Sequence, residues 1–225
     1  MDNIHFYNIC GTNAYIIEEE NVAILIDPAG EDNAKNIYKM INNTPLKEKI
    51  QLIVLTHGHN DHVNGVNFLS EKIKAPILIH EGDMPLIGKS KYALHTRKLI
   101  GKIGRKFISD IAYSEEFKPE MIMKGNSLSL EKWGIKAKVI HTPGHTKGSV
   151  SIIYKDNIFV GDTFMNIFRP SEALFAENFQ QLDLSIKRIM MLQFNMLFPG
   201  HGKSFTKEVL IKSEKELGRR SNYEK

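Results

Sequence analysis

Cysteine is nearly absent from this chain of 225 residues, which has only Cys10. One thiol cannot build an internal disulfide framework, and it cannot form the CxxC pair of many zinc and redox sites. Such scarcity is typical of proteins from a reducing compartment. We therefore expect the protein to be cytoplasmic.

Long apolar runs and linkers are missing as well. No uncharged apolar stretch approaches the roughly 18 to 20 residues that a helix needs to cross a bilayer, and the N-terminus lacks a basic segment followed by an apolar one. The sequence has no repeat, no low-complexity segment and no linker rich in proline, glycine or serine. Because 42% of the residues are hydrophobic, we predict one core and a single domain over residues 1–225, without a membrane partner.

A strong net charge is also lacking, since 30 Lys and Arg residues against 26 Asp and Glu residues leave a formal charge of +4. This density is too low for a dedicated nucleic-acid binder, so we do not expect nucleic acid as a partner. Seven Lys or Arg residues and no acid are nevertheless clustered between Lys89 and Lys106. This basic segment favours an anionic small-molecule substrate if it lies near a site, and it is otherwise a solvated helical face.

The order of the expected elements is that of an α/β protein. Short aliphatic and β-branched runs alternate with longer amphipathic stretches, a pattern typical of sheets covered by helices. The expected strands are residues 13–19, 22–27, 50–56, 75–80, 134–142, 149–154, 157–162 and 195–199. The expected helices are residues 32–42, 63–71, 179–193 and 207–217.

Histidine and aspartate side chains stand at or just after the ends of five expected strands. They stand in the sequences "LID", "THGHNDH", "TPGHT", "GDT" and "PGHG", as Asp27, His57, His59, Asp61, His62, His145, Asp162 and His201. A structural role explains one or two such positions but not all of them. A metal site explains them together, because imidazole nitrogen and carboxylate oxygen are ligands of zinc and related ions.

The spacing within "HGHNDH" separates these side chains into two sets. Residues two apart in an extended segment point to the same side, so His57 and His59 can converge on one metal ion. Asp61 and His62 can then bind a second ion. Since no cysteine accompanies the motif, the pattern indicates a catalytic site that keeps a position for water.

With these motifs the chain resembles the metallo-β-lactamase superfamily, and within it the glyoxalase II-like hydrolases, without the C-terminal helical domain of glyoxalase II. The resemblance spans about residues 10–203 and implies a four-layer αβ/βα sandwich with two central sheets. It implies that Asp162 bridges two metal ions and that Asp27 orients a metal-binding histidine. The ligand sets that it implies are His57, His59 and His145 for the first ion, and Asp61, His62 and His201 for the second.

The activity that the resemblance implies is hydrolysis of a small ester, thioester or lactone by a hydroxide held between two divalent ions. Zinc is the expected metal, with iron or manganese as alternatives. Asp61 would be catalytic by orienting the hydroxide and accepting its proton. Two other activities stay open. One is an iron-dependent thiol or persulfide dioxygenase that uses mainly the first ligand set, and the other is a phosphodiesterase or ribonuclease that uses the basic segment.

Two further histidines stand at or near strand ends without belonging to these motifs. We expect His80 to make a structural hydrogen bond. We expect His141 to pack within its strand or to face solvent.

Overall fold

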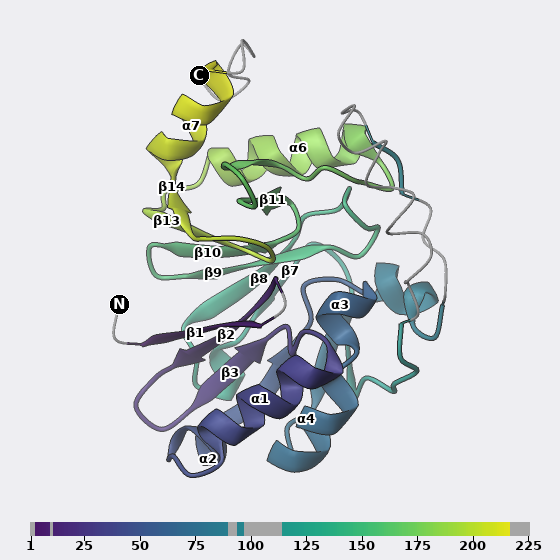
Figure 1. Ribbon diagram of the computed structural model, residues 1–225, viewed down its shortest axis with the longest axis vertical. Helices are drawn as coiled ribbons and strands as arrows, with labels where there is room; N and C mark the ends of the chain where they lie inside the picture. Colours follow the sequence, from purple (N-terminus) through teal and green to yellow (C-terminus); the bar gives the residue numbers. More distant parts are fainter. Residues whose placement is uncertain (1–2, 10, 90–93, 97–113, 217–225) are drawn as a thin grey trace.

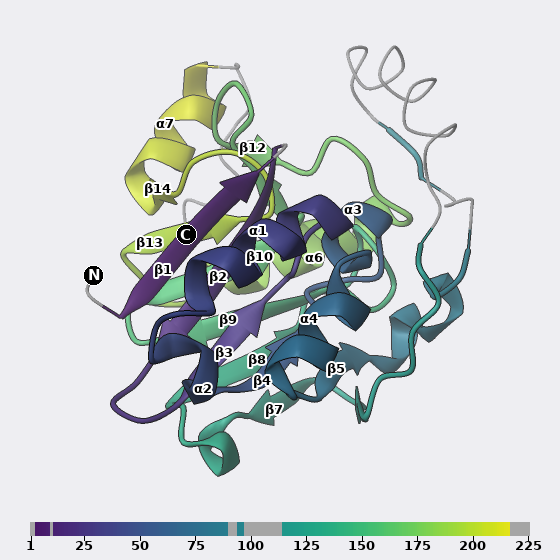
Figure 2. The same cartoon turned by 60° about the horizontal axis from the view of Figure 1, so that its bottom comes forward.

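The computed structural model describes residues 3–9, 11–89, 94–96 and 114–216. Two six-stranded sheets pack face to face, and helices cover their outer faces (Figure 1 and Figure 2). The layers therefore run helix, sheet, sheet, helix. This arrangement confirms the predicted αβ/βα sandwich.

The first sheet has the strand order β1-β2-β3-β4-β5-β6. Its strands are β1 (Ile4–Ile9), β2 (Thr12–Glu18), β3 (Ala23–Ile26), β4 (Ile50–Val54), β5 (Ile77–His80) and β6 (Met121–Met123). The first three strands pair antiparallel, and β3 to β6 pair parallel. Because of this parallel pairing, the carboxyl ends of β3, β4 and β5 meet at one edge of the sheet.

The second sheet has the order β14-β13-β10-β9-β8-β7. Its strands are β7 (Ser127–Ser129), β8 (Ala137–His141), β9 (Val150–Tyr154), β10 (Asn157–Gly161), β13 (Met196–Pro199) and β14 (Phe205–Thr206). Only β10 and β13 pair parallel among these described strands. A separate hairpin of β11 (Phe164–Met165) and β12 (Ser171–Glu172) follows β10.

The outer layers are amphipathic helices. Those with the first sheet are α1 (Glu31–Ile41), α2 (Leu46–Lys49), α3 (Asn60–Val63) and α4 (Val66–Ile73); those with the second are α6 (Phe179–Met190) and α7 (Lys207–Glu216) (Figure 1). Short 3₁₀ turns are η1 (Glu81–Leu86) and η2 (Glu131–Trp133). Asn178 caps the start of α6, because its side-chain oxygen accepts hydrogen bonds from the backbone N–H groups of Gln180 and Gln181, at 2.9 and 3.1 Å.

The central strand β3 of the first sheet is apolar on both faces because both faces are covered. In β3, Ile24 and Ile26 belong to the cluster between the two sheets, whereas Ala23 and Leu25 pack in the cluster beneath α1 and α4. This alternation follows the two-residue period of a strand. It explains why the sequence shows an unbroken apolar run there instead of alternating polar residues.

All eight expected strands are confirmed, as β2, β3, β4, β5, β8, β9, β10 and β13, and so are the four expected helices, with ends that differ by up to three residues. The sequence did not predict β1, β6, β7, β14 or the β11–β12 hairpin. Four of these elements have strands of only two or three residues, which are too short for a periodic signal.

None of the helices that the structure describes is long and apolar enough to span a membrane. Of the basic segment, the structure describes only Lys89 and residues 94–96. Its remaining Lys and Arg residues lie outside the described residues, so the role suggested for them stays a prediction.

Candidate metal centre

The motif "HGHNDH" follows β4. Its first part is extended, and its last part forms the first turn of α3. His59 is the residue immediately before the helix, with φ −74° and ψ 146°. The helix begins there because the backbone N–H groups of His62 and Val63 both bond to the His59 carbonyl, at 3.0 and 3.1 Å. Asp61 and His62 therefore project from a helical turn, whereas His57 and His59 precede it, and this change of backbone separates the two sets.

The first group of close ring nitrogens comprises His57, His59 and His145. Each residue offers one nitrogen within 4.8 Å of the others, and His59 Nδ1 lies 3.0 Å from His145 Nε2. All three rings are buried, with 1%, 5% and 2% exposure. Since His145 follows β8 of the second sheet, the packing of the two sheets assembles this group.

The second group comprises Asp61, His62 and His201, whose ligand atoms also lie within 4.8 Å of one another. Asp61 Oδ2 is 3.2 Å from His201 Nε2 and 3.7 Å from His62 Nε2, and the two imidazole Nε2 atoms are 3.3 Å apart. The Asp61 side chain is 43% exposed and that of His201 is 17% exposed. The second group is therefore the open side of the cluster.

Asp162 lies between the two groups. Its carboxylate oxygens are 3.5 Å from His62 Nε2, 3.6 Å from His145 Nε2 and 3.3 Å from His201 Nε2. The close approach depends on Gly200, because a Cβ at that position would lie 2.2 Å from Asp162 Oδ1. The glycine beside His201 thus leaves room for a carboxylate shared by both groups.

Hydrogen bonds on the outer side of the cluster fix the orientation of four imidazoles. His145 Nδ1–H donates to the Phe175 carbonyl at 2.8 Å, and His201 Nδ1–H donates to the Gly11 carbonyl at 2.9 Å. Carbonyl oxygens only accept, so these bonds place the proton on Nδ1 and leave the Nε2 lone pair facing inward. This is the arrangement that metal-binding histidines adopt.

Asp27 orients the other two of these imidazoles, one directly and one through Thr56. His62 Nδ1–H donates to Asp27 Oδ2 at 2.9 Å, while the backbone N–H and the hydroxyl of Thr56 donate to the same carboxylate at 2.7 and 2.6 Å. Because the Thr56 hydroxyl proton goes to Asp27, His57 Nδ1–H must donate to Thr56 Oγ1, at 3.0 Å. Asp27 thus holds a histidine of each group.

The first group is held neutral by its surroundings. Burial lowers the pKa of His57 well below its usual value and lowers the pKa of His59 to about 3, and the neighbouring imidazoles add to both effects. Burial also lowers the pKa of His145. Neutral imidazole is the form that binds metal.

The second group attracts positive charge. Burial opposes protonation of His62, but the charges of Asp61 and Asp162 outweigh it and raise the pKa of His62 to about 9. Asp162 likewise raises the pKa of His201 well above its usual value, also against burial. The two carboxylates therefore create a negative potential, which favours binding of a proton or a metal cation.

The donor set and its distances fit divalent metal ions. Two ligands about 2.1 Å from a tetrahedral ion lie roughly 3.4 Å apart, and the Asp–His contacts of the second group span 3.2 to 3.7 Å. Among the described residues, His57 Nε2 and Asp162 Oδ1 are buried atoms without a hydrogen-bond partner. Buried polar atoms without partners are costly, and coordination to a cation removes that cost.

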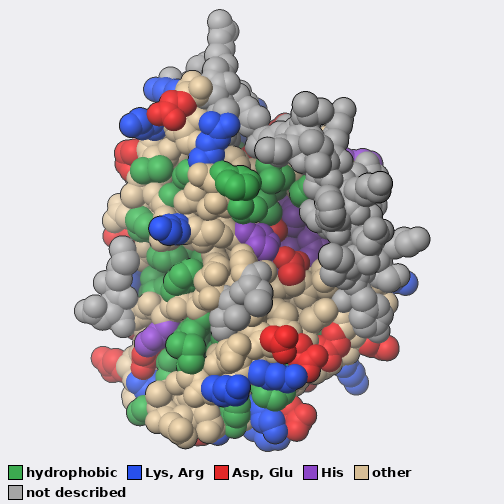
Figure 3. All heavy atoms as spheres, in the orientation of Figure 1, with side chains coloured by type: hydrophobic (Ala, Val, Ile, Leu, Met, Phe, Trp, Pro, Cys, Tyr) green, Lys and Arg blue, Asp and Glu red, His purple; other side chains and the backbone are tan. Residues whose placement is uncertain are grey.

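The cluster opens to one face of the molecule. Figure 3 shows histidine side chains at the bottom of a hollow near the centre of this face, with an acidic side chain and a group of hydrophobic side chains beside them. The exposure of Asp61 and His201 agrees with an entrance on this side. A small molecule can therefore reach the second group from solvent.

Asp83 joins the loops on which the first group stands, and the sequence analysis missed it. Its carboxylate is fully buried and accepts hydrogen bonds from Gly58 N–H at 2.8 Å, Thr146 Oγ1–H at 2.7 Å and Gly148 N–H at 2.5 Å. Burial raises the pKa of Asp83 to about 6, against these three donors. The only signal in the sequence is an aspartate just after a strand, which is common in turns.

Asn13 clamps the loop that carries His201, and it was also missed. Its side-chain amide contacts Tyr15 Oη at 2.9 Å, the Pro199 carbonyl at 2.8 Å and the Gly202 carbonyl at 2.7 Å. Asn13 is completely buried. An asparagine in a strand gives no hint that its partners lie nearly 190 residues away.

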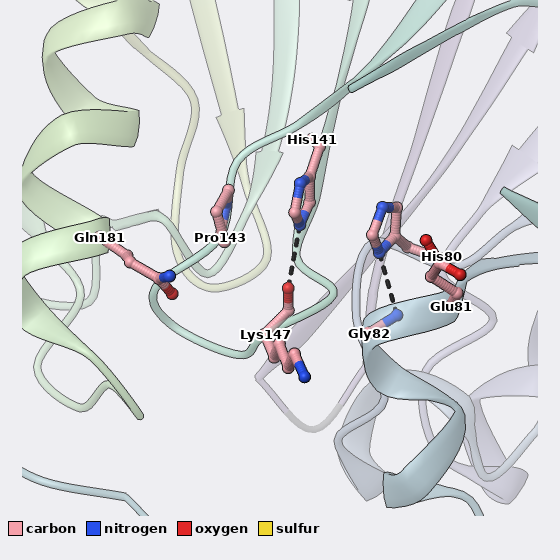
Figure 4. Close-up of a pocket in the computed structure, with 7 residues that line it drawn as sticks. All are labelled: His80, Glu81, Gly82, His141, Pro143, Lys147 and Gln181. Atoms are coloured by element: carbon pink, nitrogen blue, oxygen red, sulfur yellow. Dashed lines mark hydrogen bonds between the residues drawn. The ribbon is translucent and has the colours of Figure 1, made fainter. Parts of the chain in front are cut away.

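A second depression, separate from these groups, lies beside the loop after β8 (Figure 4). The His80 and His141 rings stack there, 3.9 Å apart and tilted by 12°. His80 accepts from Gly82 N–H and donates to the Gly125 carbonyl, both at 3.1 Å, which confirms the expected structural hydrogen bond. His141 is partly exposed at the end of β8 and donates to the Lys147 carbonyl at 2.9 Å, so neither imidazole belongs to the cluster.

The sequence of this chain is similar to a known protein family and to several named proteins. The sequence profile of the Metallo-beta-lactamase superfamily matches residues 7–201. A probable metallo-hydrolase of Methanocaldococcus jannaschii is 26% identical over 197 residues, which cover 85% of this chain and 88% of that protein. Hydroxyacylglutathione hydrolase 1 of Vibrio vulnificus is 27% identical over 186 residues, which cover 82% of this chain and 59% of that enzyme.

Solved structures show the same architecture. A protein crystallised in a di-iron-bound form is 26% identical, superposes with a TM-score of 0.68, and is matched over 92% of this chain and 96% of its own. A B3 metallo-beta-lactamase is 22% identical with a TM-score of 0.71, matched over 95% and 96% of the two chains. At that identity the second similarity concerns the fold alone.

Proposed function

The chain belongs to the metallo-beta-lactamase superfamily, and we propose that it is a binuclear metal-dependent hydrolase of the glyoxalase II-like type. The observation that carries the proposal is Asp162, a buried carboxylate within 3.6 Å of histidines from both groups. This carboxylate lies between a group of neutral imidazoles and a group that attracts positive charge. Such an arrangement suits a site for two metal ions.

The residues that would hold the ions follow from the two groups. The first ion would be held by His57, His59 and His145, the second by Asp61, His62 and His201, and both by Asp162. When bound, such ions lower the pKa of a coordinated water to about 7 and polarise a substrate oxygen. Zinc suits imidazole and carboxylate ligands. Iron is the alternative, supported by the relative in a di-iron-bound form.

Asp61 is the candidate general base. Its carboxylate is the most exposed of the cluster and lies at the entrance, 3.2 Å from His201 Nε2. Although burial opposes ionisation, the charges of His62 and His201 lower the pKa of Asp61, so it is ionised at pH 7. As an anion at the entrance it can orient an attacking water by accepting a hydrogen bond from it.

The substrate class that we propose is a small ester, thioester or lactone. The open side of the cluster admits a small molecule next to Asp61. Hydrolysis of an acyl bond needs a nucleophilic water and a stabilised oxyanion, which a pair of ions can supply without a serine or cysteine nucleophile. The relative from Vibrio vulnificus is named as a hydroxyacylglutathione hydrolase, and this supports an acyl substrate.

Purified protein should contain close to two transition-metal ions per chain and should hydrolyse at least one acyl substrate when loaded with zinc or iron. Elemental analysis measures the first quantity. A screen of thioesters, lactones, aryl esters and phosphodiesters measures the second. Protein that holds no metal, and takes up none on reconstitution, would refute the proposed site, and activity on phosphodiesters alone would refute the acyl substrate.

Replacement of Asp27 by alanine should weaken metal binding about 10- to 100-fold without removing a ligand, because His62 and Thr56 lose the carboxylate that orients them. Competition with a metal chelator measures this affinity. Asp32→Ala, which removes an exposed carboxylate from the first turn of α1, is the matched control. Equal affinities of the two variants would show that Asp27 does not orient the site.

A further inference from the structure

The tip of the β11–β12 hairpin exposes two apolar side chains in an unusual way. Phe168 is 89% exposed and Ile167 is 52% exposed. Isolated exposed apolar residues are common on protein surfaces, but two adjacent ones are informative when they stand beside a ligand-binding hollow. We call Ile167 and Phe168 the apolar rim.

Hydrogen bonds attach the hairpin to the loop that carries His201. The backbone N–H of Asn166 donates to the His201 carbonyl at 2.9 Å, and its side-chain amide donates to the Lys203 carbonyl at 2.9 Å. The approach requires Gly202, which has φ +85° and whose Cβ would lie 1.8 Å from the Asn166 carbonyl oxygen. The apolar rim therefore begins one residue from the segment that holds a proposed ligand.

The other side of the tip is anchored as well. The Pro170 carbonyl accepts a hydrogen bond from Ser213 Oγ of α7 at 2.8 Å, and Pro170 is buried. Only three residues, 167–169, therefore lie between two fixed points. Phe168 therefore lies on a three-residue tip that is anchored by hydrogen bonds on both sides.

The hairpin that carries the apolar rim is bonded to the open side of the centre. Asp61 and His201 are the exposed members of the cluster, and the hairpin is bonded to the backbone of His201. Figure 3 shows hydrophobic side chains directly beside the histidines of the hollow, where Figure 1 places β11 in the same orientation. A molecule bound at the cluster would therefore extend toward solvent beside this hairpin.

We propose that the apolar rim binds the hydrophobic acyl chain of the substrate, so that the enzyme prefers medium-length alkyl acyl groups over acetyl. This inference rests on the proposed hydrolytic function and specifies its substrate class. A second copy of the chain is a poorer occupant, because two side chains provide far less than the roughly 800 Å² per partner of a stable interface.

Binding of straight-chain carboxylates tests the rim without requiring turnover. Acetate, butanoate, hexanoate and octanoate are the products that such substrates would release, and calorimetry on the metal-loaded full chain measures their affinities. The affinity of the unmodified protein should rise with chain length. Phe168→Ala should weaken octanoate binding about tenfold and acetate binding by about twofold or less, and Phe168→Leu should lie between.

The control is Met40→Ala, which removes a 59% exposed apolar side chain from α1 and should leave all four affinities unchanged. Affinities that do not depend on chain length, including no binding at all, would overturn the proposal. So would a chain-length dependence that survives both Phe168→Ala and Ile167→Ala. A dimer that Phe168→Ala dissociates in analytical ultracentrifugation would assign the rim to a second copy instead.

The same variants separate this inference from the proposed hydrolase function. If no ester or thioester is hydrolysed but octanoate binding depends on Phe168, the apolar rim is supported and the hydrolytic function fails. If esters are hydrolysed at rates independent of acyl length and of Phe168, the hydrolase stands and the rim is refuted.

Discussion

Replacement of Asp162 by alanine should lower the hydrolytic rate about 1,000-fold or more and reduce the content of both metal ions. The physical reason is its position, since this one carboxylate faces His62, His145 and His201 at 3.3 to 3.6 Å. Its pKa is lowered against the effect of burial by the charges of His201 and His62, so the native group is an anion. Its loss removes negative charge from both groups at once.

Two measurements decide this prediction, namely elemental analysis of the purified variant and its steady-state rate on the best substrate found. Asp162→Asn is the matched variant, because it keeps the size of the side chain and removes the charge. Asp32→Ala, on the surface of α1, controls for the loss of a carboxylate elsewhere. Full metal content and rate in Asp162→Ala would show that Asp162 is not shared between two ions.

Replacement of Asp83 by alanine should destabilise the protein by about 3 kcal/mol, because two buried backbone N–H groups lose their acceptor. These groups belong to Gly58 and Gly148, and both are buried. The Thr146 hydroxyl keeps Ser149 Oγ as a partner at 2.7 Å, so it contributes less to the loss. Chemical denaturation of the metal-free protein measures the effect.

Asp83→Ala should also weaken metal binding, although Asp83 contacts none of the proposed ligands in the hydrogen bonds described. It fixes the loop between His57 and His59 to the loop after His145, and a loss of about tenfold in affinity is expected for such a supporting residue. Glu81→Ala removes an exposed carboxylate two residues away and should have neither effect. A free energy of unfolding within about 0.5 kcal/mol of the unmodified protein would contradict the assigned role.

The helices and central strands could be predicted because their signals are local. β3 is apolar at every residue and β4 at every residue except Gln51, and α6 repeats apolar residues at helical spacing, so each element is encoded within its own segment. The short strands and the β11–β12 hairpin are different. They form because a distant segment, such as the loop carrying His201, supplies their hydrogen bonds, and no local pattern records that.

The sequence by itself determined which side chains could serve a metal site. Histidines and aspartates placed after strand ends can meet only if those ends share one edge, and the spacing of "HGHNDH" already divided them into two sets. The family resemblance supplied the same grouping. Imidazole and carboxylate chemistry is a property of residue type, so it can be read without coordinates.

Only the tertiary structure decided how these side chains are held and where the site opens. Asp83, Asn13 and Thr56 fix the loops through partners remote in sequence, and the pKa values of the histidines depend on burial and on charges from both sheets. The exposure of Phe168 beside His201 likewise arises from two anchors that lie in separate elements. Contacts of this kind depend on how the layers pack, because burial and distance are properties of the folded arrangement and not of any one segment.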